Sequence, residues 1–204
     1  MRTLKWIAIA AGALIILVVI GGWLFLKYGA SGFSAREKPS AVETTMAHFA
    51  RDVAIPSSAK SQSNPVPDTP EVLAQARAHW ADHCAVCHAN DGSGGTEMGR
   101  GMYPPPPDMR QKDTQQKSDG ALFYIIENGI RLSGMPAWGG PGIDPQDSWK
   151  LVRFIRHLPQ LTAEEKSEME KLNPKGPEER KEEEEEDKFL KGEPTNEPKT
   201  EHHH

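Results

Sequence analysis

The chain opens with an unbroken apolar stretch, WIAIAAGALIILVVIGGWLFL, which covers residues 6–26 and contains no charged side chain. At about 1.5 Å per residue these residues form a helix of roughly 31 Å, enough to cross the hydrocarbon core of a bilayer. The apolar region of a secretory signal is shorter, about 7–15 residues. We therefore expect residues 1–27 to form an uncleaved transmembrane anchor, with a cleaved signal and a buried core helix as the alternatives.

The charges beside this stretch predict its orientation. Arg2 and Lys5 precede it, and no acidic residue does. Because basic residues favour the cytoplasmic side of a membrane, the N-terminus is expected to be cytoplasmic. We predict a single-pass protein of the inner (cytoplasmic) membrane that contacts the lipid bilayer through residues 6–26, with everything after Lys27 facing the periplasm.

The next segment, residues 28–68, is rich in Ser, Ala, Pro and Gly. As a flexible linker of about 40 residues it would reach on the order of 35 Å from the membrane. Inside it, Val42, Met46, Phe49 and Val53 fall at helical spacing. We expect a short helix here that either packs on the following domain or lies at the membrane surface.

Helical periodicity dominates residues 69–161, and strand patterns are weak. Three helices are predicted, at residues 70–84, 118–128 and 144–158, each with a capping residue before it. Their apolar stripes are Leu73, Ala76 and Trp80; Leu122, Ile125 and Ile126; and Leu151, Phe154, Ile155 and Leu158. The pattern predicts an all-α fold, a small helical domain that needs a large cofactor or another covalent element to complete its thin core.

The acidity of the chain lies in a charged C-terminal tail, which we expect at residues 162–204. Residues 163–204 carry 15 acidic and 8 basic side chains, whereas residues 1–162 carry 14 and 16. The segment EERKEEEEEDK is therefore expected to be a solvated helix or disordered. Nothing in the charge pattern is typical of a protein that binds nucleic acid.

The two cysteines of the chain stand together in the sequence CAVCH, residues 84–88. This matches C-x-x-C-H, the attachment motif for haem c. Two thiols about one helical turn apart can each add to one vinyl group of the same porphyrin, and His88 is then placed as the proximal iron ligand. A disulfide between Cys84 and Cys87 and a structural zinc site are the alternatives, although zinc usually needs a second ligand pair.

A methionine opposite a histidine is a frequent sixth ligand of haem iron and raises its reduction potential. Met135 lies in RLSGMPAWGG, where Gly134 and Pro136 favour a loop close against a flat ligand. Because a whole helix separates it from His88, this loop can reach the opposite face of the porphyrin. Three further methionines are competitors for the role: Met98, Met102 and Met109.

Residues 70–160 resemble the class I cytochromes c, the electron carriers with a single haem. The resemblance rests on CAVCH, on GMPAW about 45 residues later and on a closing helix in WKLVRFIRHLP. It implies that the first and last helices cross with Trp80 and Phe154 in contact, and that Ala76 stands where the family usually has glycine. It also implies that the Pro107 carbonyl accepts a hydrogen bond from the His88 imidazole.

Other residues near the motifs have expected supporting roles. Tyr103, Trp138 and Trp149 are expected on or near the porphyrin. Arg131, just before the Met135 loop, is either a partner of a haem propionate or an ordinary surface charge.

The sequence predicts a membrane-anchored c-type cytochrome with one covalently attached haem, which carries single electrons between periplasmic or membrane redox proteins. It is expected to be an electron carrier rather than an enzyme, and is alternatively the haem subunit of a larger oxidoreductase. Two other hypotheses stay open. A sensor or enzyme would bind a small ligand at iron after Met135 is displaced, and a disulfide-bonded membrane module would carry no haem.

Overall fold

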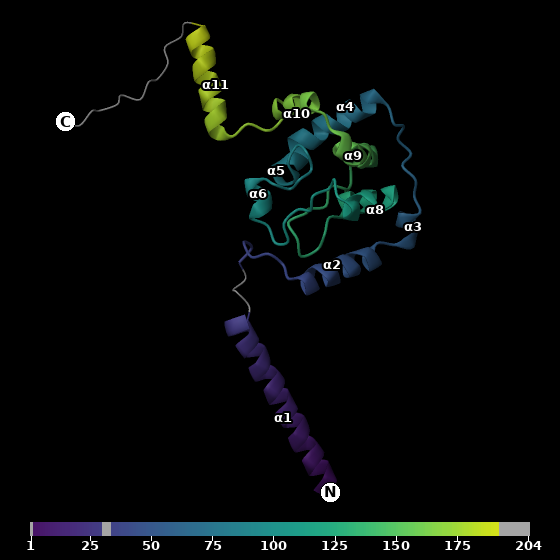
Figure 1. The fold of residues 1–204 in the computed structure, drawn as a ribbon, viewed down its shortest axis with the longest axis vertical. Helices are drawn as coiled ribbons and strands as arrows, with labels where there is room; N and C mark the ends of the chain where they lie inside the picture. The colour runs from purple at the N-terminus through teal and green to yellow at the C-terminus, as the bar shows by residue number, and fades with distance from the viewer. Residues whose placement is uncertain (1, 30–33, 192–204) are drawn as a thin grey trace, which may run out of the picture.

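The computed structural model describes residues 2–29 and 34–191 (Figure 1). It opens with helix α1, Arg2–Leu24, which runs on into a π-helical turn, η1, Phe25–Gly29. The apolar side chains of α1 are exposed, and Arg2–Tyr28 is long and apolar enough to cross a membrane. The predicted membrane helix is therefore present as a candidate span.

The rest of the described chain is helical, without a strand in residues 34–191, which confirms the predicted all-α class. The elements are α2 Ala41–Ala54, α3 Ser57–Lys60, α4 Pro70–His79, η2 Trp80–Cys84, α5 Ala85–His88, α6 Glu97–Arg100, α7 Lys112–Gln115, α8 Asp119–Asn128, α9 Pro145–His157, η3 Leu158–Gln160, α10 Ala163–Glu170 and α11 Pro177–Leu190.

The three predicted helices of the domain begin and end where their capping residues indicate. The Thr69 hydroxyl accepts a hydrogen bond from the Val72 amide, and Ser118 caps α8 in the same way. The Asp144 carboxylate caps α9 through the Gln146 amide at 3.0 Å. These side chains satisfy amides that a helix N-terminus leaves without a partner inside the helix.

The core forms where α4 and η2 pack against α9. Trp80 and Phe154 are 2% and 0% exposed, and their ring centroids lie 5.4 Å apart, which confirms the predicted contact between the first and last helices of the domain. Ala76 is buried in the same cluster. Trp149 stacks on Phe123, with ring centroids 4.0 Å apart and the planes 5° from parallel.

The short helix expected within residues 28–68 is present as α2, but the segment after α2 packs on the domain instead of forming a flexible linker. Ile55 and Ala59 are buried against Ala121 of α8, and Val66 belongs to the main core. The Val66 carbonyl accepts hydrogen bonds from the Arg153 guanidinium at 2.7 and 3.0 Å. The reason is physical: a few scattered apolar residues and buried backbone contacts order this segment, and neither produces a periodic pattern.

The domain also extends beyond residue 161, where the acidic tail was expected to begin. Met169 of α10 is fully buried in the main core. Arg77 of α4 pairs with Glu165 at 3.1 Å and with Glu168 at 2.6 Å, and Glu165 also lies 3.0 Å from His157. One apolar anchor and a small ion-pair network therefore attach α10 to the domain.

The charged segment that follows is a helix, α11, which agrees with one of the two expectations for EERKEEEEEDK. The terminal histidines, residues 202–204, lie outside the described residues.

Candidate functional site

The CAVCH motif lies at the end of one continuous helical stretch. Helix α4, the π-helical turn η2 and α5 follow one another without a break from residue 70 to residue 88. Cys84 and Cys87 are free thiols and partly buried, and His88 is buried. The motif is thus placed by the same helix that packs on α9.

The chain turns sharply immediately after His88. Ala89 has φ 61° and ψ 160°, a conformation that residues with a Cβ atom rarely adopt and that clusters at functional sites. The Trp80 indole nitrogen donates to the Ala89 carbonyl at 2.9 Å. The Trp80 and His88 rings lie 5.7 Å apart. Trp80 therefore supports both the imidazole and the turn that follows it.

A predominantly apolar cavity of about 220 Å³ opens beside the motif. All five predicted site residues line it, contributed by three separate segments: Cys84, Cys87, His88, Pro107 and Met135. Other wall residues come from α8, α9 and the loops between them, including Leu122, Ile126, Ile130, Trp138, Leu151 and Ile155. The fold thus brings together residues separated by about 50 positions in the sequence.

The loop that carries Met135 is held close to the end of α8. The Ile130 amide donates to the Met135 carbonyl at 3.1 Å, and the Met135 amide donates to the Ser133 hydroxyl at 3.1 Å. Gly129 has φ +65°, and a Cβ atom there would lie 2.7 Å from the Met135 carbonyl oxygen. Only glycine fits this approach, so Gly129 both ends α8 and allows the loop to fold back.

Two of the competing methionines also line the cavity. Met102 and Met109 are wall residues, whereas Met98 is 55% exposed and is not. The Met102 sulfur lies 2.7 Å from where a Cβ atom on Gly134 would stand. Met102 therefore reaches the Met135 loop from the loop that follows the CAVCH motif.

Burial determines which ionisable side chains of the CAVCH motif carry a proton. It raises the pKa of the Cys84 thiol to about 12, with a smaller contribution from Cys87, and it also raises the pKa of Cys87. Burial lowers the pKa of His88 to about 4. At neutral pH the site therefore offers two protonated thiols and a neutral imidazole, the form in which histidine binds a metal.

The expected hydrogen bond between His88 and the Pro107 carbonyl is absent. The buried Nδ1 atom of His88 has no hydrogen-bond partner in the described part of the chain. Pro107 nevertheless lines the cavity together with Pro104, Pro105 and Pro106. The proline run acts as an apolar wall in this structure.

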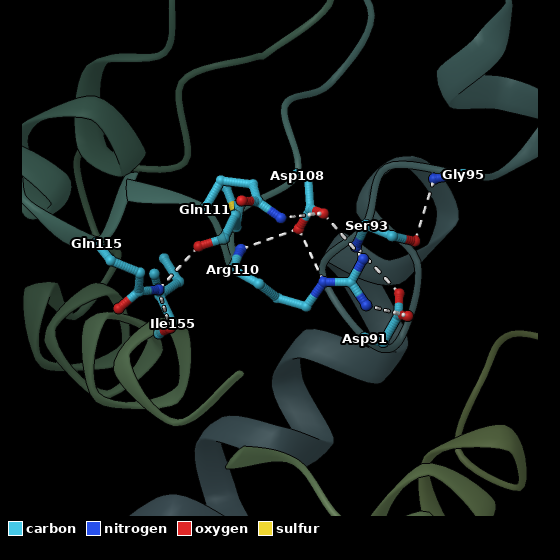
Figure 2. A network of polar contacts seen from close by, with 9 residues as sticks. Asp91, Ser93, Gly95, Asp108, Arg110, Gln111, Gln115 and Ile155 are labelled. Carbon is cyan, nitrogen blue, oxygen red and sulfur yellow. Dashed lines mark hydrogen bonds and ion pairs between the residues drawn. The ribbon is translucent and has the colours of Figure 1, made fainter. Parts of the chain in front are cut away.

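A polar network fixes the loops on either side of this wall (Figure 2). Arg110 donates to both carboxylate oxygens of Asp108 at 2.8 and 2.9 Å and to Asp91 at 2.8 Å. The bidentate hydrogen bond from Arg110 holds the pKa of Asp108 well below its usual range. Because Asp91 follows the haem motif and Asp108 follows the prolines, the network ties these two loops together.

Helix α2 forms a wall of the cavity that the sequence did not predict. Its residues Ala47, His48 and Arg51 line the cavity. His48 and Arg51, with Lys117, also line an adjoining polar cleft of about 390 Å³. Helical spacing predicted α2 itself, but the side chains that face the site are polar, so no apolar periodicity marked them as packed.

Two expected neighbours of the porphyrin lie elsewhere. Tyr103 donates to Glu43 at 2.8 Å and lines neither cavity, and Trp149 packs on Phe123. Arg131 is exposed and outside both cavities, which agrees with the ordinary surface charge that the sequence left open. Trp138 does line the apolar cavity.

The zinc alternative has no set of ligands in the described residues. Among them, no group of three or more His, Cys, Asp or Glu side chains is arranged to hold a metal ion. The cavity instead offers one buried imidazole and several thioethers within apolar walls. This donor set suits a large apolar cofactor with an iron centre rather than a bare divalent ion.

Residues 71–155 match the family model described as "Cytochrome C oxidase, cbb3-type, subunit III". No curated protein matches the chain. The chain therefore contains a cytochrome c domain, a haem-binding domain of electron carriers, preceded by one helix that is suited to membrane anchoring. This match confirms the predicted class of protein, a chain with a cytochrome c domain.

Proposed function

We propose that the chain holds one haem c, covalently attached, in the cavity beside the CAVCH motif and passes single electrons between redox proteins at the membrane. The observation that carries this proposal is the gathering of Cys84, Cys87, His88 and Met135 around one apolar cavity. A substrate-converting site is not needed for this role, because the cofactor itself is reduced and oxidised.

The residues present fit a haem. Apolar side chains form most of the wall, as a porphyrin requires, and the cysteines lie next to the imidazole at the end of α5. His88 is neutral at physiological pH because of its burial, so metal binding does not have to displace a proton from it. A bound haem supplies a one-electron couple of its iron between the ferric and ferrous states.

The protein's own residues have distinct roles. The Cys84 and Cys87 thiols would form the covalent attachment, and His88, held in place by Trp80, would bind the iron. Met135, on a loop restrained by two hydrogen bonds, would supply a second iron ligand, whose thioether would raise the reduction potential. The surrounding apolar walls would exclude water from the iron.

The covalent attachment is tested by the intact mass of the full chain produced with haem c maturation machinery. We expect the denatured protein to keep the mass of one haem. A double variant, Cys84→Ser with Cys87→Ser, is expected to keep none, while the single variants keep haem through one bond or mature poorly. A wild-type chain without added mass would contradict haem c.

The identity of the sixth ligand is tested by comparing Met135→Ala with Met102→Ala. If Met135 binds iron, only its replacement removes the absorption band that depends on a methionine–iron bond and lowers the reduction potential. Met102→Ala is the matched control, since its sulfur reaches the same loop. Loss of the band in the Met102 variant alone would assign the ligand to Met102.

We also propose that His48, Arg51 and Lys117 would hold the carboxylates of the haem. These side chains line both the apolar cavity and the polar cleft beside it. A porphyrin has one charged edge, which is most stable where the cavity changes from apolar to polar. Asp52 pairs with Arg51 at 3.2 Å and with Lys117 at 2.9 Å, so it orients both cations and partly offsets their charge.

This arrangement predicts different effects of two arginine substitutions. Arg51→Gln removes a positive charge near the haem and should lower the reduction potential by on the order of tens of millivolts, since the reduced site carries one more negative charge. Arg131→Gln removes an exposed charge outside both cavities and should leave the potential nearly unchanged. Potentiometric titration measures the reduction potential of both variants. A larger shift in Arg131→Gln than in Arg51→Gln would contradict the proposed position of the haem carboxylates.

For the whole chain, we propose that residues 1–27 anchor it in the inner membrane with the haem domain in the periplasm. Arg2 and Lys5 at the N-terminal end of α1 support this orientation. We place the cytochrome domain from α2 to α10, and α11 with the acidic residues beyond it as an appended segment. The partners are periplasmic or membrane redox proteins, and a fixed place as the haem subunit of a larger oxidoreductase is the alternative.

A further inference from the structure

Helix α2 presents an apolar face to solvent. Val42, Met46, Phe49 and Val53 are 68%, 67%, 70% and 66% exposed. They recur at intervals of four, three and four residues, and at about 100° per residue they fall within roughly 60° of the helix circumference. Four large apolar side chains aligned in this way form a continuous stripe rather than isolated exposed residues.

The opposite face of α2 is the one that meets the domain. His48 and Arg51 line the haem cavity, and on the helix circumference they lie roughly opposite the apolar stripe. The helix therefore packs on the domain, one of the two alternatives that the sequence left open, but not through its apolar stripe. The helix contacts the domain through polar side chains and leaves its apolar side chains outside.

Contacts at both ends hold α2 in this orientation. The Ser40 and Glu43 side chains form a reciprocal cap at its N-terminus, and Tyr103 donates to Glu43 at 2.8 Å. Near its C-terminus, Lys117 donates to Asp52 at 2.9 Å. The contacts with Tyr103 and Lys117 come from two different parts of the domain, and they orient the apolar stripe outward in this structure.

The position of α2 along the chain identifies what covers the stripe. Only residues 30–40 separate η1, at the end of the candidate membrane span, from α2. Even fully extended, this segment spans at most about 40 Å. It carries Arg36 and Lys38, and Lys27 ends the apolar stretch before it. Basic residues beside an amphipathic helix with an exposed Phe are typical of helices that lie in the lipid headgroup region.

We propose that α2 lies in the membrane interface, with Val42, Met46, Phe49 and Val53 inserted at the boundary between headgroups and acyl chains. The inference rests on the proposed anchoring through α1. The haem cavity then lies on the far side of a single helix from the lipid, about 10–12 Å across. The domain is held against the membrane surface in one orientation, which suits partners whose redox centres lie close to that surface.

The experiment uses the full haem-loaded chain in lipid nanodiscs that contain a single copy and no other protein. A nitroxide is attached to Phe49→Cys, and its collision rates with oxygen and with a water-soluble nickel chelate report its depth. The native cysteines are bound to haem and do not react. Ala54→Cys is the matched control, because Ala54 is exposed on the same helix but off the stripe. Ile16→Cys reports the position of α1.

We expect the Phe49 label to collide several-fold more with oxygen and less with the chelate than the Ala54 label, and the Ile16 label to lie deepest. If the Ile16 label lies in the lipid but the Phe49 label collides with the water-soluble chelate as often as the Ala54 label does, membrane docking is overturned while the anchor stays intact. An aqueous Ile16 label would overturn the anchoring itself, and docking with it. A Phe49 label shielded from both reagents would indicate protein contact and would also overturn the proposal. Met46→Cys repeats the measurement at a second position on the stripe.

Discussion

Trp80 is the side chain on which the rest of the site depends. Its indole packs on Phe154 of α9, lies beside the His88 ring and donates to the carbonyl of Ala89, the strained residue that follows the motif. One buried side chain thus joins the packing of the domain to the position of the proposed iron ligand. Displacing Trp80 would remove packing from the core and support from both the His88 imidazole and the turn at Ala89. The stability of the domain and its binding of haem are therefore coupled through this side chain.

The cavity around this point is assembled from segments with different physical constraints. The CAVCH end is rigid because it continues a packed helix. The Met135 loop is restrained by Gly129, Ser133 and its own backbone, and the proline wall is stiff and tied by the Arg110 network. Helix α2 closes the polar side. The protein's own packing and hydrogen bonds therefore fix the walls of this cavity.

Much of this arrangement could be predicted from the sequence. CAVCH and the residues at which α4, α8 and α9 begin are local signals, whereas the contact of Trp80 with Phe154 is implied by the resemblance to the class I cytochromes c. The structure shows the three helices and this contact as expected. Residues outside these patterns were missed for identifiable reasons. Met169 is a single apolar anchor in an acidic segment, and Arg51 lines the cavity through a polar helix face, so neither contributes to a hydrophobic period. The positions of Tyr103 and Trp149 depend on tertiary packing, which spacing along the chain does not determine.

The most direct measurement is the visible absorption spectrum of the reduced full chain before and after carbon monoxide is added. If His88 and a methionine close both axial positions, the spectrum of the low-spin haem should stay unchanged, as expected for an electron carrier whose iron keeps six ligands in both oxidation states. Rapid formation of a carbon monoxide adduct would contradict a closed site and would instead indicate a haem protein that binds small ligands.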